Sequence, residues 1–414
     1  MARAAVPGGM LAPAVWAGTR ALLLLCAAGV LVLPGPDVTS DVDVIYRGWY
    51  GVLSRGAYPA DDVTWQYPPG AALAILSPGL LRPLDYAAAF TVLLLLCDLA
   101  VLVLVHRAGR RAGTRRGTWT WVAGVPLLGP TAYTRYDLMV TAVAVAALTA
   151  GVRRPRAMGA LAAFGALVKV WPALLLVGVP RGRTARRCFT AALVVAGAGT
   201  AALAAALPGA LAFAAFQRDR GTEVESFGAL VFHLARHAGW EGEVLLNYGS
   251  VEFVGPYVGL VSGLALAAAA AAGAWLVVWR LRARRWGPQG PADAAFAAVL
   301  LFTVTSRVLS PQYLVWLVGL AAVCLVHPRT RMVRPALLVL AATGVTLLEF
   351  PVLFAHVVAG DALGVALLVV RNGLLAAAAL GACRGLWRAT SAGRGGTGGA
   401  LSRAALADGR ATAR

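Results

Sequence analysis

Apolar runs recur from one end of this chain to the other, each about 15 to 24 residues long and almost free of charge. A helix needs roughly 20 residues to cross a bilayer core about 30 Å thick, and in lipid only helices and closed barrels satisfy their own backbone hydrogen bonds. The composition agrees, because 59% of the 414 residues are hydrophobic and 13% are charged, against about 25% charged in soluble domains. The sequence therefore predicts an all-α polytopic membrane protein.

The basic residues indicate which loops face the cytoplasm. The formal net charge is +19, which could suggest a nucleic-acid partner. The Arg residues, however, form short clusters between apolar runs, and Asp408 is the one acid in the same segments. Such clusters are typical of cytoplasmic loops, and they lack the aromatic residues of a nucleic-acid surface. We expect a multi-pass cell-membrane protein that binds no nucleic acid, with cytoplasmic clusters at 106–117, 152–156, 181–187, 280–286, 329–334 and 384–414.

This orientation predicts one membrane domain over 1–388, with outer loops at 35–84 and 213–254, and a disordered cytoplasmic tail over 389–414. The tail is rich in Gly, Ser, Ala and Arg and has too little apolar content for a core. About ten full spans are expected, at 17–34, 85–105, 118–133, 138–151, 188–212, 255–279, 291–306, 309–327, 335–357 and 362–383.

Two segments do not fit a simple span. Residues 69–82 are apolar but short and contain Pro78 and Gly79, so they either span or form a juxtamembrane helix, and the Arg clusters favour the second. Residues 157–180 have Arg clusters on both sides and Lys169-Val170-Trp171-Pro172 in the middle. Proline removes a helix hydrogen bond and disfavours helix before it. We expect a broken-helix hairpin with Lys169 at its tip, lining a cavity or buried in protein.

Acids gather in the two outer loops, at a net charge of −3 in 35–68 and again in 213–254. Asp41 and Asp43 directly follow the first span. A partly desolvated carboxylate at the membrane rim can act as a general base toward a hydroxyl. The structural alternative is a pair of acids that caps a short helix. Whether both face one site depends on local structure, since side chains two apart share a face only in an extended chain.

The first loop ends in Asp61-Asp62-Val63-Thr64-Trp65-Gln66-Tyr67-Pro68-Pro69-Gly70. The two prolines and the glycine predict a helix start, because proline is well tolerated in the first helical turn. Trp65 and Tyr67 are candidates to line a sugar or lipid site. They could equally be aromatic residues of the membrane interface.

Three cations lie between apolar runs. Lys169 is the one lysine of the chain; a charge at membrane depth costs about 2.5 to 3.5 kcal/mol, so it should face protein or a water-filled cavity. A phosphate would be a natural partner for it, and a structural ion pair is the alternative. Arg135 and Arg307 lie in short polar outer turns, where a guanidinium can clamp a phosphate or anchor the turn against Asp137 or a loop acid.

Other charged residues favour structural roles. Glu349 and Arg371 lie in the last two spans and are expected to pair with each other. The histidines have no metal-ligand spacing, and no nucleotide-binding or hydrolase motif is present. We therefore predict neither a metal site nor a cofactor.

Six motifs in chain order resemble glycosyltransferase family 87. They are the acid pair after the first span, GAYPADDVTWQYPPG (56–70), RYD (135–137), GALVKVWPALLL (165–176), QRDRGTEVES (217–226) and SRVLSPQYLVWL (306–317). The resemblance covers roughly residues 15 to 380. Members of this family are actinobacterial GT-C-type mannosyltransferases that use polyprenyl-phosphate-mannose. The resemblance implies a GT-C-type helical bundle and inverting transfer of a hexose at the extracytoplasmic face.

The resemblance also implies roles for single residues. The base would be Asp41, with Asp43 as the competitor. The donor phosphate would contact Lys169, Arg135, Arg307, Arg218 and Arg220. The sugar or acceptor would contact Tyr67, Trp65, Glu223, Glu225 and Gln312.

The implied partners are a polyprenyl-phosphate-linked sugar and an extracytoplasmic glycolipid, glycan or lipid-linked acceptor. A transporter or flippase of lipid-linked precursors is the alternative function. A transporter would be expected to show inverted repeats and acids near the midplane, whereas most acids here lie in the two outer loops.

Overall fold

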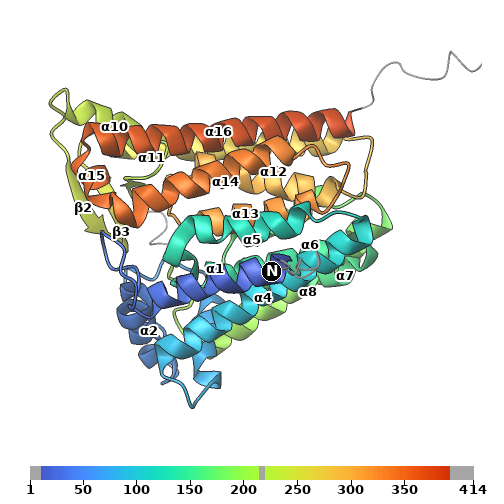
Figure 1. Ribbon diagram of the computed structural model, residues 1–414, viewed down its shortest axis with the longest axis horizontal. Helices are drawn as coiled ribbons and strands as arrows, with labels where there is room; N and C mark the ends of the chain where they lie inside the picture. Colours follow the sequence, from blue (N-terminus) through green and yellow to red (C-terminus); the bar gives the residue numbers. More distant parts are fainter. Residues whose placement is uncertain (1–10, 214–219, 392–414) are drawn as a thin grey trace, which may run out of the picture.

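The computed structural model describes residues 11–213 and 220–391, mostly as helices that run roughly side by side (Figure 1). The first half contains α1 (Leu11–Ala27), η1 (Asp41–Tyr46), α2 (Arg47–Leu53), α3 (Ala71–Leu76), η2 (Ser77–Leu80), α4 (Tyr86–Ala112), α5 (Arg116–Gly124), η3 (Pro126–Tyr133), α6 (Asp137–Ala150), η4 (Gly151–Arg153), α7 (Pro155–Val168), η5 (Trp171–Gly178) and α8 (Arg183–Ala206). The second half contains β1 (Thr222–Glu223), α10 (Ala229–Arg236), β2 (Glu243–Asn247), β3 (Ser250–Val254), α11 (Val258–Arg282), α12 (Gly290–Thr305), α13 (Tyr313–Leu325), α14 (Val333–Leu347), η6 (Leu348–Val352), α15 (Phe354–Ala359) and α16 (Ala362–Thr390).

Among the described residues, five helical stretches are long and apolar enough to cross a membrane, which confirms the expected helical membrane class. They are Tyr86–Ala112, Arg183–Ala206, Val258–Arg282, Val333–Val352 and Ala362–Thr390. Shorter apolar helices, such as α6 and α13, pack between them. The helix ends follow ordinary capping chemistry: the Asp85 carboxylate accepts hydrogen bonds from the amides of Ala87 and Ala88, and Gly113 closes the same helix with a φ of 70°.

The core lies around α12 and α13. Twelve of the 13 residues of α13 are buried, and this helix packs against α5, α6, α12 and α14. In the apolar stretch of α8 and of α11, by contrast, only 11% is buried. An apolar helix that leaves most of its surface uncovered has the character of a lipid-facing element, so we place α8 and α11 at the periphery.

The first helix lies earlier than predicted. The sequence predicts a span over 17–34, whereas α1 covers Leu11–Ala27. Gly29 takes a φ of 70° and its amide donates to the carbonyl of Cys26. A glycine in this conformation ends a helix whatever the hydropathy of the residues that follow, and so the apolar residues Val30–Leu33 lie beyond the helix.

The short helices and the break predicted for the two irregular segments are present, and their positions relative to the membrane stay predictions. Residues 69–82 form only the short helices α3 and η2. The 157–180 segment is interrupted between α7 and η5, where Lys169 is extended with φ −156° and ψ 126°. Lys169 therefore lies at the break itself.

The second outer loop departs from an all-helical chain. It contains a three-stranded antiparallel sheet in the order β1-β3-β2, in which Glu223 pairs with Glu252 and Asn247 with Ser250. These strands are two to five residues long, too short for a clear alternation in the sequence. The sheet lies with α10 and α15 at the left end in Figure 1, the same end as α2, and the C-terminal end of α16 lies at the right.

The domain boundaries stay predictions. Helix α16 continues to Thr390, and residues 392–414 of the predicted tail lie outside the described residues.

Candidate active site

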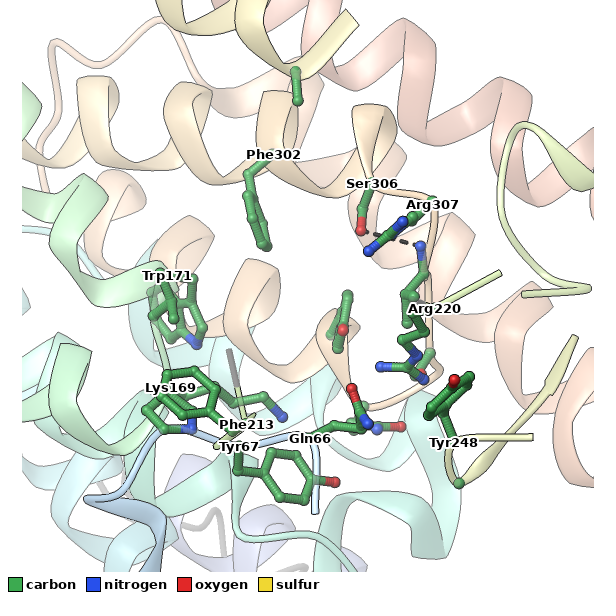
Figure 2. A pocket seen from close by; sticks show the side chains of 18 of the residues that line it. Gln66, Tyr67, Lys169, Trp171, Phe213, Arg220, Tyr248, Phe302, Ser306 and Arg307 are labelled. Atoms are coloured by element: carbon green, nitrogen blue, oxygen red, sulfur yellow. Dashed lines mark hydrogen bonds between the residues drawn. The ribbon is translucent and has the colours of Figure 1, made fainter. Parts of the chain in front are cut away.

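A cavity of about 420 Å³ opens where the two outer loops meet the helix bundle (Figure 2). Four of the sequence motifs contribute to its wall, although they lie far apart in the chain. The polar and aromatic lining residues are Thr64, Gln66, Tyr67, Lys169, Trp171, Arg220, Tyr248, Ser306, Arg307, Gln312 and Tyr313, and the apolar ones include Phe213, Leu266, Ala269 and Phe302.

The charged groups on this wall are all cationic. Lys169, Arg220 and Arg307 line the cavity, and none of the described residues in the lining is an acid. Trp171 and Phe302 lie on one side in Figure 2, and Arg220 and Arg307 on the other. Lys169 lies on the side of Trp171 in Figure 2. A cavity that combines cationic groups with apolar wall residues is suited to an anion that carries an apolar tail.

Lys169 is held at the cavity by a buried ion pair. Its Nζ lies 2.7 Å from Oδ1 of Asp137, and the indole of Trp316 donates to the same oxygen at 2.6 Å. Four rings surround the ammonium group at 5.1 to 5.6 Å, from Tyr67, Tyr136, Tyr313 and Trp316. These contacts fix the head group where the broken helix presents it. The predicted ion pair is therefore present, at a site that also lines the cavity.

Arg220 is positioned by the small sheet. Its Nε lies 3.1 Å from Oε1 of Glu252 on β3, and its Nη2 donates to the Ser250 hydroxyl at 2.7 Å. The other oxygen of Glu252 accepts from the amide of Gly221. Arg218, the neighbouring candidate, lies outside the described residues.

Glu223 binds the loop that carries Arg307. Its carboxylate accepts from the amide of Leu309 and from the Ser310 hydroxyl at 2.8 Å, and its amide donates to the carbonyl of Arg307. Burial raises the pKa of the Glu223 carboxyl, and Arg220 and the two hydrogen bonds oppose that rise. The resemblance implied sugar contact for Glu223, whereas the structure directs its carboxylate at protein and outside the cavity lining.

Glu225 also lies away from the cavity. Its side chain is buried, and its carbonyl accepts a hydrogen bond from Arg371 at 2.8 Å. Burial, with the charge of Glu349 nearby, raises the pKa of the Glu225 carboxyl well above its usual value. The predicted pair of Glu349 and Arg371 is confirmed, at 2.8 Å with both side chains fully buried.

Asp41 forms an ion pair with Arg135. Asp43 is exposed in the same turn η1 and has no hydrogen-bond or ion-pair partner among the described residues. Arg135 thus anchors a loop acid, one of its two predicted roles, and it donates to the Thr134 carbonyl. Burial raises the pKa of Asp41, Arg135 opposes the rise and Asp37 adds to it. Neither Asp41 nor Arg135 is in the cavity lining.

Tyr67 lines the cavity wall. Burial, followed by the charges of Asp137 and Asp41, raises its pKa to about 12. Trp65 instead is 1% exposed, packs edge-on against Trp49 and Tyr58, and donates to the Tyr67 carbonyl at 3.0 Å. Trp65 supports the Tyr67 segment from behind and is absent from the cavity wall.

Several residues of this site were not candidates from sequence. Asp137, Glu252 and Trp316 hold the cations, and Tyr248 lines the cavity from the tip of the β2–β3 hairpin. The RYD and SRVLSPQYLVWL motifs contain Asp137 and Trp316, and so could have indicated them. Among residues 11–213 and 220–391, no group of three His, Cys, Asp or Glu side chains is placed to hold a metal ion.

The bundle and its cavity define a helical membrane protein with a cationic site between the two acidic loops, 35–84 and 213–254. A comparison with protein families matches residues 65–311 to glycosyltransferase family 87, and because this match covers more than half of the 414 residues, the chain belongs to that family. No curated protein matches the chain.

Two solved structures show a weaker likeness in fold. Both are ArnT from Cupriavidus metallidurans. The first, bound to undecaprenyl phosphate, has a TM-score of 0.44 and 16% identity. The second, in the apo state, has a TM-score of 0.45 and 15% identity. Each comparison covers 90% of this chain and 76% of the other. The assignment of this chain rests on the family match.

Proposed function

We propose that this glycosyltransferase is a GT-C-type enzyme that moves a hexose, mannose, from a polyprenyl-phosphate donor to an extracytoplasmic acceptor with inversion. The observation that carries the proposal is the cavity wall, with three cations, no acid among its described residues and an apolar side. A lipid phosphate has this combination of charge and tail. The acceptor is a glycolipid, a glycan or a lipid-linked sugar, and the enzyme lies in the cell membrane with its site on the outer side.

In the proposed reaction the acceptor hydroxyl attacks the anomeric carbon opposite the phosphate. The bond from that carbon to the phosphate oxygen breaks, and the electron pair leaves with the polyprenyl phosphate. Asp41 takes the hydroxyl proton as general base. Lys169, Arg220 and Arg307 stabilise the charge that develops on the leaving phosphate, and Tyr67 and Gln312 contact the sugar.

The roles of the remaining candidates follow from their contacts. Arg135 holds Asp41 in its carboxylate form rather than binding phosphate, because their ion pair favours the charged acid. Glu223 keeps the Arg307 loop in place through its bonds to Leu309 and Ser310. Glu225 and Trp65 contribute to packing. No step requires a nucleotide, because the lipid phosphate is itself the leaving group.

The test compares Asp41→Asn with Asp43→Asn in membranes supplied with labelled polyprenyl-phosphate-mannose. We expect Asp41→Asn to lower transfer at least 100-fold, in line with the loss of a general base, and Asp43→Asn to stay within two- to threefold of the unmodified protein. The two positions are matched, since both acids lie in η1. The opposite pattern would move the base to Asp43, and full activity in both variants would contradict a loop-one base.

The same assay tests the donor. Labelled product from polyprenyl-phosphate-mannose would support mannose as the transferred sugar. If product forms only from another polyprenyl-phosphate hexose, that hexose is the transferred sugar and the proposed reaction is otherwise unchanged. Movement of a lipid-linked precursor across the bilayer without a new glycosidic bond would favour the transporter or flippase.

A further inference from the structure

Tyr248 lies in a backbone conformation that a tyrosine rarely adopts. It has a φ of +47°, and Gly249 beside it has a φ of +75°. The two residues form the two-residue loop of the β2–β3 hairpin, between the paired residues Asn247 and Ser250. Positive φ at both loop positions is typical of a type I′ turn, where Asn-Gly is strongly preferred. Glycine is therefore the expected residue at the second position, whereas tyrosine at the first needs another explanation.

The cavity provides that explanation. Tyr248 lines it together with Gly249, and in Figure 2 its ring lies on the side of Arg220 and Gln66, away from Trp171 and Phe302. Tyr248 is half-buried, and no hydrogen bond, ion pair or ring contact of its side chain is present among the described residues. An unfavourable backbone kept at a site wall is a reason to infer a function there.

The hairpin tip is also held in place from both sides. A Cβ added at Gly249 would come within 3.7 Å of Thr64 in the first loop, so the tip contacts that loop. Behind the tip, the Ser250 hydroxyl donates to Glu252 at 2.9 Å and accepts from Arg220 at 2.7 Å. The tyrosine ring is thus carried next to Arg220, a phosphate-binding candidate, by a fixed turn, which gives it a defined position at the cavity wall.

We propose that Tyr248 binds the pyranose ring of the substrate, as the aromatic face of the sugar subsite beside Arg220. This inference rests on the proposed function. The ring offers an apolar face to the C–H side of the sugar and a phenol to a sugar hydroxyl. Lys169, Arg220 and Arg307 would hold the phosphate, so that the loss of Tyr248 affects recognition of the sugar and leaves recognition of the lipid phosphate intact.

The test uses Tyr248→Asn, because asparagine suits the turn and removes the ring. Tyr257→Asn is the matched control: Tyr257 also has a positive φ, of 67°, but is 72% exposed and is absent from the cavity wall. Thermal unfolding of the purified full-length protein is measured without ligand, with undecaprenyl phosphate and with undecaprenyl-phosphate-mannose. Mannose transfer in membranes is measured in parallel.

We expect Tyr248→Asn to be as stable as the unmodified protein without ligand and to be stabilised equally by undecaprenyl phosphate. It should be stabilised less than the unmodified protein by the mannose-bearing lipid, and its KM for that donor should rise at least tenfold. Tyr257→Asn should match the unmodified protein throughout. Retention of the mannose-dependent stabilisation and of the KM in Tyr248→Asn would overturn the inference.

A second variant separates the contribution of the ring from that of the hydroxyl. Tyr248→Phe keeps the ring and loses the hydroxyl, and we expect a smaller rise in KM than for Tyr248→Asn. If both variants lose stabilisation by undecaprenyl phosphate as well, Tyr248 is structural and the inference fails. If the unmodified protein is not stabilised by undecaprenyl phosphate at all, the proposed function itself fails, and the inference that depends on it fails with it.

Discussion

A single residue at this site can line the cavity and also form a buried ion pair. Lys169 is the example, because its ammonium group lines the cavity while Asp137 neutralises it from behind. The sequence could indicate an unusual lysine between apolar runs, but it could not choose between a phosphate ligand and a structural partner. The ion pair uses one oxygen of Asp137, which Trp316 also contacts. Because Lys169 still lines the cavity, the ion pair is compatible with the proposed contact to phosphate.

Replacing Lys169 should separate these roles. Lys169→Gln leaves Asp137 without its cation, and removing one partner of a buried pair costs about 3–5 kcal/mol. In the double variant Lys169→Gln with Asp137→Asn, we expect the unfolding temperature to recover and transfer to stay low. Thermal unfolding and the transfer assay measure the two effects, and recovery of transfer in the double variant would make Lys169 purely structural.

The acid limb of the pH profile should report on Asp41. Burial raises the pKa of this carboxyl above its usual value, and a general base works only when deprotonated, so transfer should fall as the pH drops through that raised pKa. Arg135 favours the carboxylate form. Arg135→Gln should therefore raise the pKa further and move the acid limb to higher pH. The dependence of kcat/KM on pH measures this, and an unchanged limb would show that Arg135 does not act on the base.

At the scale of elements, the sequence predicts helix interruptions at proline better than it predicts where helices end or which short strands pair. Pro172 predicted the interruption at Lys169, and Pro68-Pro69-Gly70 predicted the start of α3, because proline and glycine act through local sterics. The end of α1 depended on Gly29 in a left-handed conformation, which hydropathy does not register. The small sheet depended on pairings between β1 and β3, some 30 residues apart, and no local pattern in these short strands carried that information.

The start of α3 gives a prediction at this scale. The amide of Gly70 donates to the carbonyl of Leu167 at 2.9 Å, and a Cβ at this position would lie 2.5 Å from that oxygen. Gly70→Ala should push α3 away from the end of α7 that carries Lys169, and overpacking of this kind costs about 1–3 kcal/mol. We expect a lower unfolding temperature and reduced transfer.

Gly48→Ala is the control for this prediction. A Cβ at Gly48 would meet nothing within 4 Å, and alanine favours the helix by roughly 0.5–1 kcal/mol. Equal unfolding temperatures for Gly70→Ala and the unmodified protein would show that the contact between α3 and α7 tolerates a side chain.

For the whole molecule, the distribution of charge along the sequence predicts that the two acidic loops lie on the same side of the bundle. The Arg clusters and the two acidic loops occupy separate segments of the chain, and in Figure 1 the elements of both acidic loops lie at one end of the bundle. The sequence could therefore predict that the loops meet. It could not predict which acids remain available, because Glu252 and Glu223 are engaged by partners brought in through the fold.

Labelling of single cysteines in intact cells tests the orientation. In a cysteine-free background, Asp61→Cys should react with a membrane-impermeant maleimide from outside, and Arg111→Cys only after permeabilisation. Both positions are exposed in the structure. Labelling of Arg111→Cys but not Asp61→Cys in intact cells would place the cavity on the cytoplasmic side and contradict the proposed location.

The cationic cavity has a consequence for turnover. In the proposed reaction the phosphate enters as a diester with one negative charge and leaves as a monoester, which at pH 7 carries about −1.5 to −2. Lys169, Arg220 and Arg307 would therefore hold the spent carrier more tightly than the loaded one. Removal of the spent carrier from the site would therefore favour turnover in the proposed reaction.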